Sequence, residues 1–302
     1  MRKNIVIGVL ILIILGLSGC TGGTGNQGVG LSKWFGGSMG LIASFESFGA
    51  SEIYEDENFP LVLLVENKGE EPVLDHEAEF EILGISPNDF SGIQFTMDNS
   101  DPLEQVSEFL PEGGFERINF GDARYDALSG RFYDANIFVQ YSYPYTTKIA
   151  VPQVCYKEDL RDPRLCEAEG TKEAYASGAP IQISMVTERP AGKGRLYLEI
   201  PIYNAGQGKS KAYLGDDFSN LYDEVAFEVK TNGWTCTSKG DPSMARISKV
   251  ENEAVIRCIS DELPTDTLYL SQFDLTLTYY YQDLVGTVIT IKENPELFGE
   301  PN

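Results

Sequence analysis

Apolar and polar residues alternate in short segments along the chain beyond residue 40, and this period of two predicts β-strands. In residues 76–83, HEAEFEIL, the side chains of Ala78, Phe80 and Ile82 share one face of the segment, and glutamates share the other. Residues 274–281, DLTLTYYY, alternate in the same way. Gly, Pro, Asn and Asp separate these segments, and no long stretch beyond residue 40 has an apolar period of 3.6 residues. The pattern predicts an all-β protein of antiparallel, half-buried strands.

The strand-like segments occur twice in the same order. The matched segments are residues 59–73 and 195–213, 76–83 and 222–230, and 136–143 and 274–281. The first pair ends in Asn-x-Gly, at Asn67 and Asn204, and the last pair matches Tyr141 with Tyr279. We infer the duplication of one domain of about 110 residues, a size typical of a single core. The boundary is expected at residues 170–180, where small and polar residues concentrate.

Short strands, 16 Tyr and 16 Phe favour Greek-key or Ig-like topology for each copy. We therefore expect two tandem Ig-like antiparallel β-sandwich domains, at residues 41–169 and 179–293, followed by a tail at residues 294–302. They would follow a lipoprotein signal peptide and a Gly-rich tether.

The N-terminal residues have the order of a signal peptide. Arg2 and Lys3 precede an apolar run at residues 5–17, which is shorter than the roughly 20 residues of a spanning helix. The next residues, Leu-Ser-Gly ending at Cys20, resemble a lipobox, the processing signal of prokaryotic lipoproteins. This resemblance implies removal of residues 1–19 and a diacylglycerol on the Cys20 thiol. An ordinary signal peptide with an incidental cysteine, or an uncleaved anchor, is the alternative.

Residues 20–40 are expected to be the lipidated cysteine and a flexible tether. The twenty residues after Cys20 include eight glycines, so they have little apolar surface to offset the entropy of ordering. As a coil, the tether would reach about 25 Å. Trp34 and Phe35 lie beside Lys33, and they would contact either the lipid interface or the folded body.

The chain is strongly acidic, with 23 Lys+Arg, 46 Asp+Glu and a formal net charge of −23. Loss of the signal peptide would remove two more cations. Nucleic acids and anionic lipid head groups bind basic surfaces, so this composition argues against both as partners.

Residues 44–73, SFESFGASEIYEDENFPLVLLVENKGEEPV, contain a Tyr-Glu turn that leads to an apolar strand ending in Asn-Lys-Gly. This segment is similar to the tandem Ig-like, cell-adhesion-related modules of archaeal and bacterial envelope lipoproteins. The resemblance implies a sandwich fold and a cell-surface setting, and it carries over no catalytic residue.

The four remaining cysteines suit an oxidising exterior. We expect disulfides within each copy, Cys155 with Cys166 and Cys236 with Cys258, because other pairings would cross the boundary. Each would stabilise the fold by roughly 3 kcal/mol. A zinc site is the alternative, although no Cys-x-x-Cys spacing is present.

The single histidine, His76, excludes sites that need two imidazoles. It follows Asp75, an arrangement that would suit a general base oriented by a carboxylate, but no Gly-x-Ser-x-Gly motif accompanies it. We expect a surface histidine, a non-enzymatic protein and no cofactor.

Two acidic clusters are weak candidates for calcium ligands. Glu55, Asp56 and Glu57 form one, and Asp216 and Asp217 belong to the other. Neither has the alternating Asp pattern of a calcium loop, and a solvated acidic surface explains both.

Tyrosines on the late strand of each copy are the remaining recognition candidates, namely Tyr143, Tyr145 and Tyr280. An exposed tyrosine row would suit protein or sugar contact, whereas a buried row would be structural. The structural role is the one we expect.

The sequence thus predicts an exported protein, anchored by lipid on Cys20 to the outer face of the cytoplasmic membrane or the cell surface. Its expected role is an interaction or structural module of the cell envelope, with an envelope protein or a glycan as partner. The alternatives are a solute- or glycan-binding lipoprotein and, less favoured, a surface hydrolase.

Overall fold

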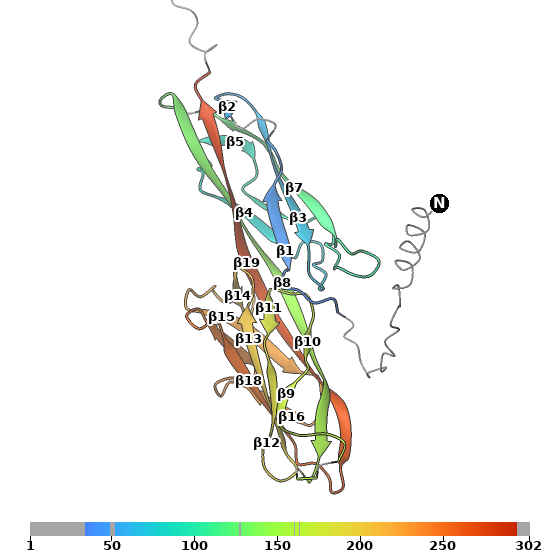
Figure 1. The fold of residues 1–302 in the computed structure, drawn as a ribbon. Coiled ribbons are helices and arrows are strands. Elements are labelled where there is room, and N and C mark those ends of the chain that lie inside the picture. The colour runs from blue at the N-terminus through green and yellow to red at the C-terminus, as the bar shows by residue number, and fades with distance from the viewer. Residues whose placement is uncertain (1–33, 49–51, 127, 160, 163, 295–302) are drawn as a thin grey trace, which may run out of the picture. The chain divides into compact units, whose positions relative to one another are not determined.

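The computed structural model describes residues 34–48, 52–126, 128–159, 161–162 and 164–294, and their regular structure is entirely β-strand (Figure 1). The expected all-β class is confirmed. Every strand pair is antiparallel except that of β2 (Glu52–Tyr54) with β19 (Leu268–Lys292), which is parallel. The described part of the chain therefore has a sandwich-like, largely antiparallel architecture.

Three sheets contain the strands. The first sheet consists of β1 (Leu41–Phe45), β3 (Phe59–Asn67), β7 (Phe115–Tyr125) and β5 (Phe90–Ile93), in that order. The second sheet, here called the shared sheet, has the order β17 (Met244–Ser248), β15 (Tyr222–Val229), β19, β8 (Phe132–Lys157), β4 (Glu79–Leu83) and β6 (Thr96–Asp98). Three short strands also pair with the two long central strands of this sheet. β10 (Tyr175–Ala176) pairs with β8, and β14 (Lys209–Lys211) and β2 pair with β19. The third sheet consists of β16 (Trp234–Thr237), β18 (Ala254–Ser260), β13 (Leu196–Asn204), β12 (Val186–Pro190) and β9 (Gly170–Lys172), with β11 (Ile181–Ile183) beside β13.

The long strands β8 and β19 pair along nearly their whole length, from Phe132 opposite Lys292 to Lys157 opposite Leu268 (Figure 1). The first part of β8 pairs with β4 of the first repeat, and its last part pairs with β10 and the start of β19. Likewise, β19 begins beside β15 and ends beside β2. Each long strand thus serves both repeats, and the described residues fall in one compact unit. The division into domains at residues 41–169 and 179–293 stays a prediction.

Strand alternation places the core where the sequence pattern indicates. Along β3 and β13, every second side chain is buried. Tyr143, Tyr145 and Tyr279 are among the largest fully buried side chains, together with Phe80. Burying such aromatic surface is the main favourable contribution to folding.

Two of the buried tyrosines, Tyr145 and Tyr281, direct their hydroxyls to the Asn-x-Gly turns. The Tyr145 hydroxyl donates to Asn67 Oδ1 at 3.2 Å, and the Gly69 N–H donates to the same oxygen at 3.1 Å. Tyr281 and Gly206 make the same two bonds to Asn204 Oδ1, at 3.1 and 3.0 Å. The repeat inferred from sequence therefore has an atomic counterpart, here called the Tyr–Asn lock.

The lock also revises the alignment of the repeats. Tyr145 corresponds to Tyr281, because both bond to the asparagine of the turn. Tyr143 corresponds to Tyr279, because the hydroxyl of each accepts a hydrogen bond from the first backbone N–H of a strand, β1 for Tyr143 and β11 for Tyr279. The sequence comparison paired Tyr141 with Tyr279, which is two residues out of step. A period of two is unchanged by a shift of two residues, so alternation alone does not reveal this error.

The Tyr–Asn lock explains why glycine follows the asparagine, and it gives a test. A Cβ on Gly206 would overlap the Tyr281 hydroxyl. We expect Gly206→Ala to lower the free energy of unfolding by about 1–3 kcal/mol through overpacking and the loss of buried hydrogen bonds. Urea denaturation followed by tryptophan fluorescence would measure the change.

Gly215→Ala is the matched control, because a Cβ there has no neighbour within 4 Å. Equal stabilities for the two variants would contradict the lock as a packing constraint.

Candidate functional site

Two disulfides cross-link the described part of the chain. Cys155 on β8 is joined to Cys166, and Cys236 on β16 to Cys258, its direct partner on β18. These are the pairs expected from the sequence. Disulfides are typical of proteins that fold in an oxidising, extracytoplasmic compartment. Cys20, the expected site of lipidation, lies outside the described residues.

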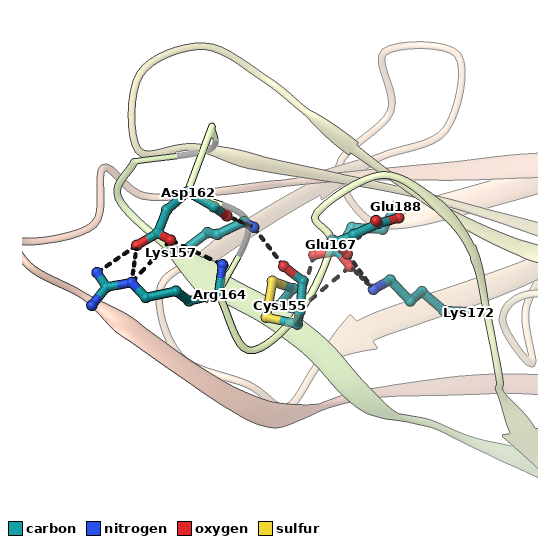
Figure 2. Close-up of a disulfide and its surroundings, with 8 residues drawn as sticks. Cys155, Lys157, Asp162, Arg164, Glu167, Lys172 and Glu188 are labelled. Carbon is teal, nitrogen blue, oxygen red and sulfur yellow. Dashed lines mark hydrogen bonds and ion pairs between the residues drawn. A yellow bond between two sulfur atoms is a disulfide. The ribbon is translucent and has the colours of Figure 1, made fainter.

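The loop closed by the first disulfide is further held by Lys157 (Figure 2). Its ammonium donates to the backbone carbonyls of Asp162 and Cys166, and Lys157 is almost fully buried. A salt bridge between Asp162 and Arg164 lies on the exposed side of the same loop. These contacts fix the loop where β8 ends.

Glu188 on β12 lies fully buried beside this disulfide (Figure 2). Its Oε1 accepts the Cys155 N–H at 3.0 Å, and its Oε2 lies 2.6 Å from Lys172 Nζ. Burial raises the pKa of Glu188 above the ordinary glutamate value, although the hydrogen bond and charge of Lys172 oppose that shift. The carboxylate caps the edge of β8, where the Cys155 N–H points away from β19.

An open cleft of about 720 Å³ lies beside the disulfide loop. Glu158, Asp159 and Arg161 line it from the end of β8, and Gly192 and Lys193 line it from the β12–β13 turn. The Lys193 ammonium lies 3.5 Å from the Glu158 carboxylate. The mixed charges suit a polar ligand, and no cysteine, serine or histidine nucleophile is among these lining residues.

A second cleft, of about 220 Å³, lies between the repeats and is here called the central cleft. Tyr143, Tyr281 and Asp283 line it with the chain at residues 38–42 and the β13–β14 turn. The Asp283 Oδ1 accepts the Leu284 N–H at 2.8 Å, and the carboxylate also accepts a hydrogen bond from Tyr141. Burial raises the pKa of Asp283, and the two hydrogen bonds oppose that rise.

The recognition candidates have different surroundings. Tyr143 and Tyr145 are buried, with their hydroxyls bonded as described above, and burial raises the pKa of both phenols. Tyr280 is half-buried, and the Lys211 ammonium lies 5.9 Å from its ring centroid, within the range of a cation–π contact. The structure therefore brings the first two into the core and leaves Tyr280 beside a cation.

The acidic candidates do not converge. Asp56 forms a salt bridge with Arg124, and Glu57 accepts the Tyr54 N–H, whereas Asp216 and Asp217 line a separate open cleft. Within the described ranges, no group of three His, Cys, Asp or Glu side chains is placed to hold a metal ion.

His76 is exposed at a turn before β4, with a φ of 61°, and its N–H donates to the carbonyl of Asn99. Sequence reasoning missed Asp283 and Glu188. Each lies in a strand whose sequence has no distinctive local motif. Tertiary contacts determine how far each carboxylate is buried, and the sequence pattern does not record those contacts.

Glu188 provides a pH-dependent test of this region. Its pKa is raised by folding, so the folded state binds this proton more readily than the unfolded chain, and ionisation of Glu188 lowers stability as pH rises. We expect Glu188→Gln to remove that loss. The unfolding free energy of the variant should therefore improve relative to the natural protein between about pH 4 and pH 7.

Denaturant titrations at several pH values would measure this difference. Glu169→Gln, which removes an exposed carboxylate from the neighbouring loop, controls for the lost charge. A constant difference between Glu188→Gln and the natural protein across the range would contradict the assignment.

No protein-family model and no curated protein matches this chain. In the ranges that the structure describes, there is also no helix with the length and apolar character needed to cross a membrane.

Proposed function

We propose that this protein is a lipid-anchored, extracytoplasmic interaction or structural module of the cell envelope, built from two Ig-like β-sandwiches and without enzymatic activity. Its partner is an envelope protein or a glycan. The lipid on Cys20 would hold the β-sheet body near the membrane.

The observation that carries this proposal is the sharing of β8 and β19 by both repeats. A solute-capturing lipoprotein usually closes two lobes around a deep cleft, which requires a hinge between the lobes. Here, two long hydrogen-bonded strands replace a hinge, since bending between the repeats would distort the ladder of β8 with β19. A rigid body of this kind is suited to presenting its surface to a binding partner.

The disulfides support the extracytoplasmic setting. The acidic composition supports a role other than contact with nucleic acid or anionic lipid head groups.

A solute- or glycan-binding role is the second candidate. The mixed-charge cleft of about 720 Å³ at the end of β8 favours it, because its size suits a small polar ligand.

The anchor is tested at Cys20. We expect the mature protein to begin at this residue and to carry the mass of a lipid there, because the lipobox directs both steps. Mass spectrometry of the N-terminal peptide measures the mass, and detergent-phase partitioning measures the anchoring. Cys20→Ser should abolish the lipid mass, and an unmodified Cys20 in the natural protein would disprove the anchor.

The interaction role is tested by crosslinking in native membranes, with recovery through a tag placed after Asn302 and mass spectrometry of the products. We expect one envelope protein in a constant ratio to the bait. Recovery of the bait alone would contradict a stable assembly role and favour the solute- or glycan-binding candidate.

A further inference from the structure

The two most exposed large apolar side chains in the described part of the chain lie in two loops. Phe109, which is 97% exposed, belongs to the loop before β7, and Val250, which is 94% exposed, belongs to the loop before β18. β7 pairs with β3, and β18 pairs with β13, so the two loops hold equivalent places in the two repeats. Single exposed apolar residues are common on protein surfaces, but these two recur at one position of the repeat.

The asparagines of the Tyr–Asn lock hold both loops at their bases. In the first repeat, the Asn67 N–H donates to the Gly114 carbonyl at 2.8 Å, and Asn67 Nδ2 donates to the Leu103 carbonyl at 3.0 Å. In the second repeat, the Asn204 N–H donates to Asn252 Oδ1 at 3.3 Å, and Asn252 Nδ2 donates to the Asn204 carbonyl at 2.9 Å. Each loop is therefore bonded to the asparagine of its own repeat.

Phe109 lies on a hydrogen-bonded turn. The Ser107 N–H donates to the Leu110 carbonyl at 3.1 Å, and the Leu110 N–H donates to the Ser107 carbonyl at 3.2 Å. The Val106 N–H donates to the Gly69 carbonyl at 2.8 Å, which fixes the turn to the end of the loop after β3. The exposure of Phe109 is thus a property of an ordered turn.

Each loop has a second exposed apolar residue beside it. The Lys249 N–H donates to the carbonyl of Leu221, and Leu221 is exposed next to the loop of Val250. Leu110 is exposed next to Phe109. Phe109 with Leu110, and Val250 with Leu221, are here called the apolar tips.

The N-terminal chain enters the body beside the first apolar tip. Glu70 is buried, and its carboxylate accepts the Phe35 N–H at 2.8 Å and the Gly36 N–H at 2.9 Å. Gly69, the preceding residue, holds the loop of Phe109 through its carbonyl. One turn therefore binds both the entering chain and the first tip.

The chain then passes between the repeats. Residues 38–42 line the central cleft together with Ala205, Gly206 and Gln207, which follow the lock asparagine of the second repeat. The chain therefore enters the body between the two turns that hold the apolar tips.

The length of chain before the described residues selects what covers the tips. Cys20 and Trp34 are fourteen positions apart, so a lipid on Cys20 would lie within about 50 Å of the point of entry. The tips flank that point, which brings the membrane surface within their reach. Apolar side chains gain free energy by leaving water for the boundary of the acyl chains.

Charges beside the tips favour apolar contact over contact with lipid charge. Glu108 and Glu251 are exposed next to Phe109 and Val250, and the chain as a whole is acidic. Anionic head groups would repel these carboxylates. A neutral membrane surface is therefore the one that the tips fit.

We propose that the two apolar tips insert into the surface of the membrane that holds the lipid on Cys20. Contacts on both sides of the entry point restrict the rotation of the anchored body, as a second membrane signal does in other lipid-anchored proteins. This inference rests on the proposed lipid anchor and adds a membrane-binding surface to it.

The test uses the mature lipidated protein in phosphatidylcholine vesicles. Its four cysteines other than Cys20 form disulfides, so an introduced cysteine is the free thiol to which the fluorophore NBD is attached. We expect labels at Phe109→Cys and at Val250→Cys to shift their emission to shorter wavelength and to be quenched by spin-labelled lipid.

Phe132→Cys is the matched control. Phe132 is also exposed, and it begins β8 about 35 Å along the strand from Tyr143 in the central cleft. Its label should keep the emission of a fluorophore in water and escape quenching.

A further variant tests the side chain of the first tip. In protein labelled at Leu110→Cys, Phe109→Asp should abolish the shift, because moving a carboxylate out of water is costly. Phe132→Asp should leave the shift unchanged. Circular dichroism checks that each variant is folded.

Unshifted labels at both tips of the lipidated protein in vesicles would overturn this proposal and leave the lipid anchor standing. A shift in the lipid-free Cys20→Ser variant without vesicles would also overturn it, because protein would then be covering the tips. The absence of lipid on Cys20 in the natural protein, measured by the mass of its N-terminal peptide, would overturn the anchor and this inference together.

Discussion

β8 and β19 exchange hydrogen bonds over nearly their whole length, and this pairing determines how the two repeats are joined. Each strand begins beside a strand of its own repeat and ends beside strands of the other. Neither repeat can complete its part of the shared sheet without the other. The two are therefore expected to unfold together, since separating them would break the central ladder and expose its apolar faces.

The Tyr–Asn locks depend on this arrangement. Tyr145 and Tyr281 lie near the middle of the long strands, where each crosses from one repeat to the other, and their hydroxyls reach the turns that end β3 and β13. A buried phenol without a partner would be costly, so each asparagine is held by a backbone N–H and accepts the phenol as well. The two repeats thus share the tyrosine–asparagine contact as well as the alternating pattern of apolar and polar residues.

Alternation in segments such as residues 76–83 was sufficient to predict the β-class and the segments that form strands. The pairs Cys155–Cys166 and Cys236–Cys258 followed from their separation in the chain. The sequence pattern could not predict that β8 and β19 each extend from one repeat into the other and pair along their length. Strand periodicity does not specify the neighbours of a strand. The half-buried Asp283 and the buried Glu188 were also missed, since partners distant in sequence determine their surroundings.

The two long strands correspond by repetition, yet different elements flank their outer edges. Along β8, the chain continues into the second repeat, so β10 and Glu188 are available to cover the edge. Along β19, the described strands on the outer edge are β15, β14 and β2. The two long strands therefore hold equivalent places in the fold, while the elements that flank their outer edges come from different parts of the chain. An uncovered strand edge favours aggregation, so the elements that flank β8 and β19 also protect the shared sheet from pairing with other chains.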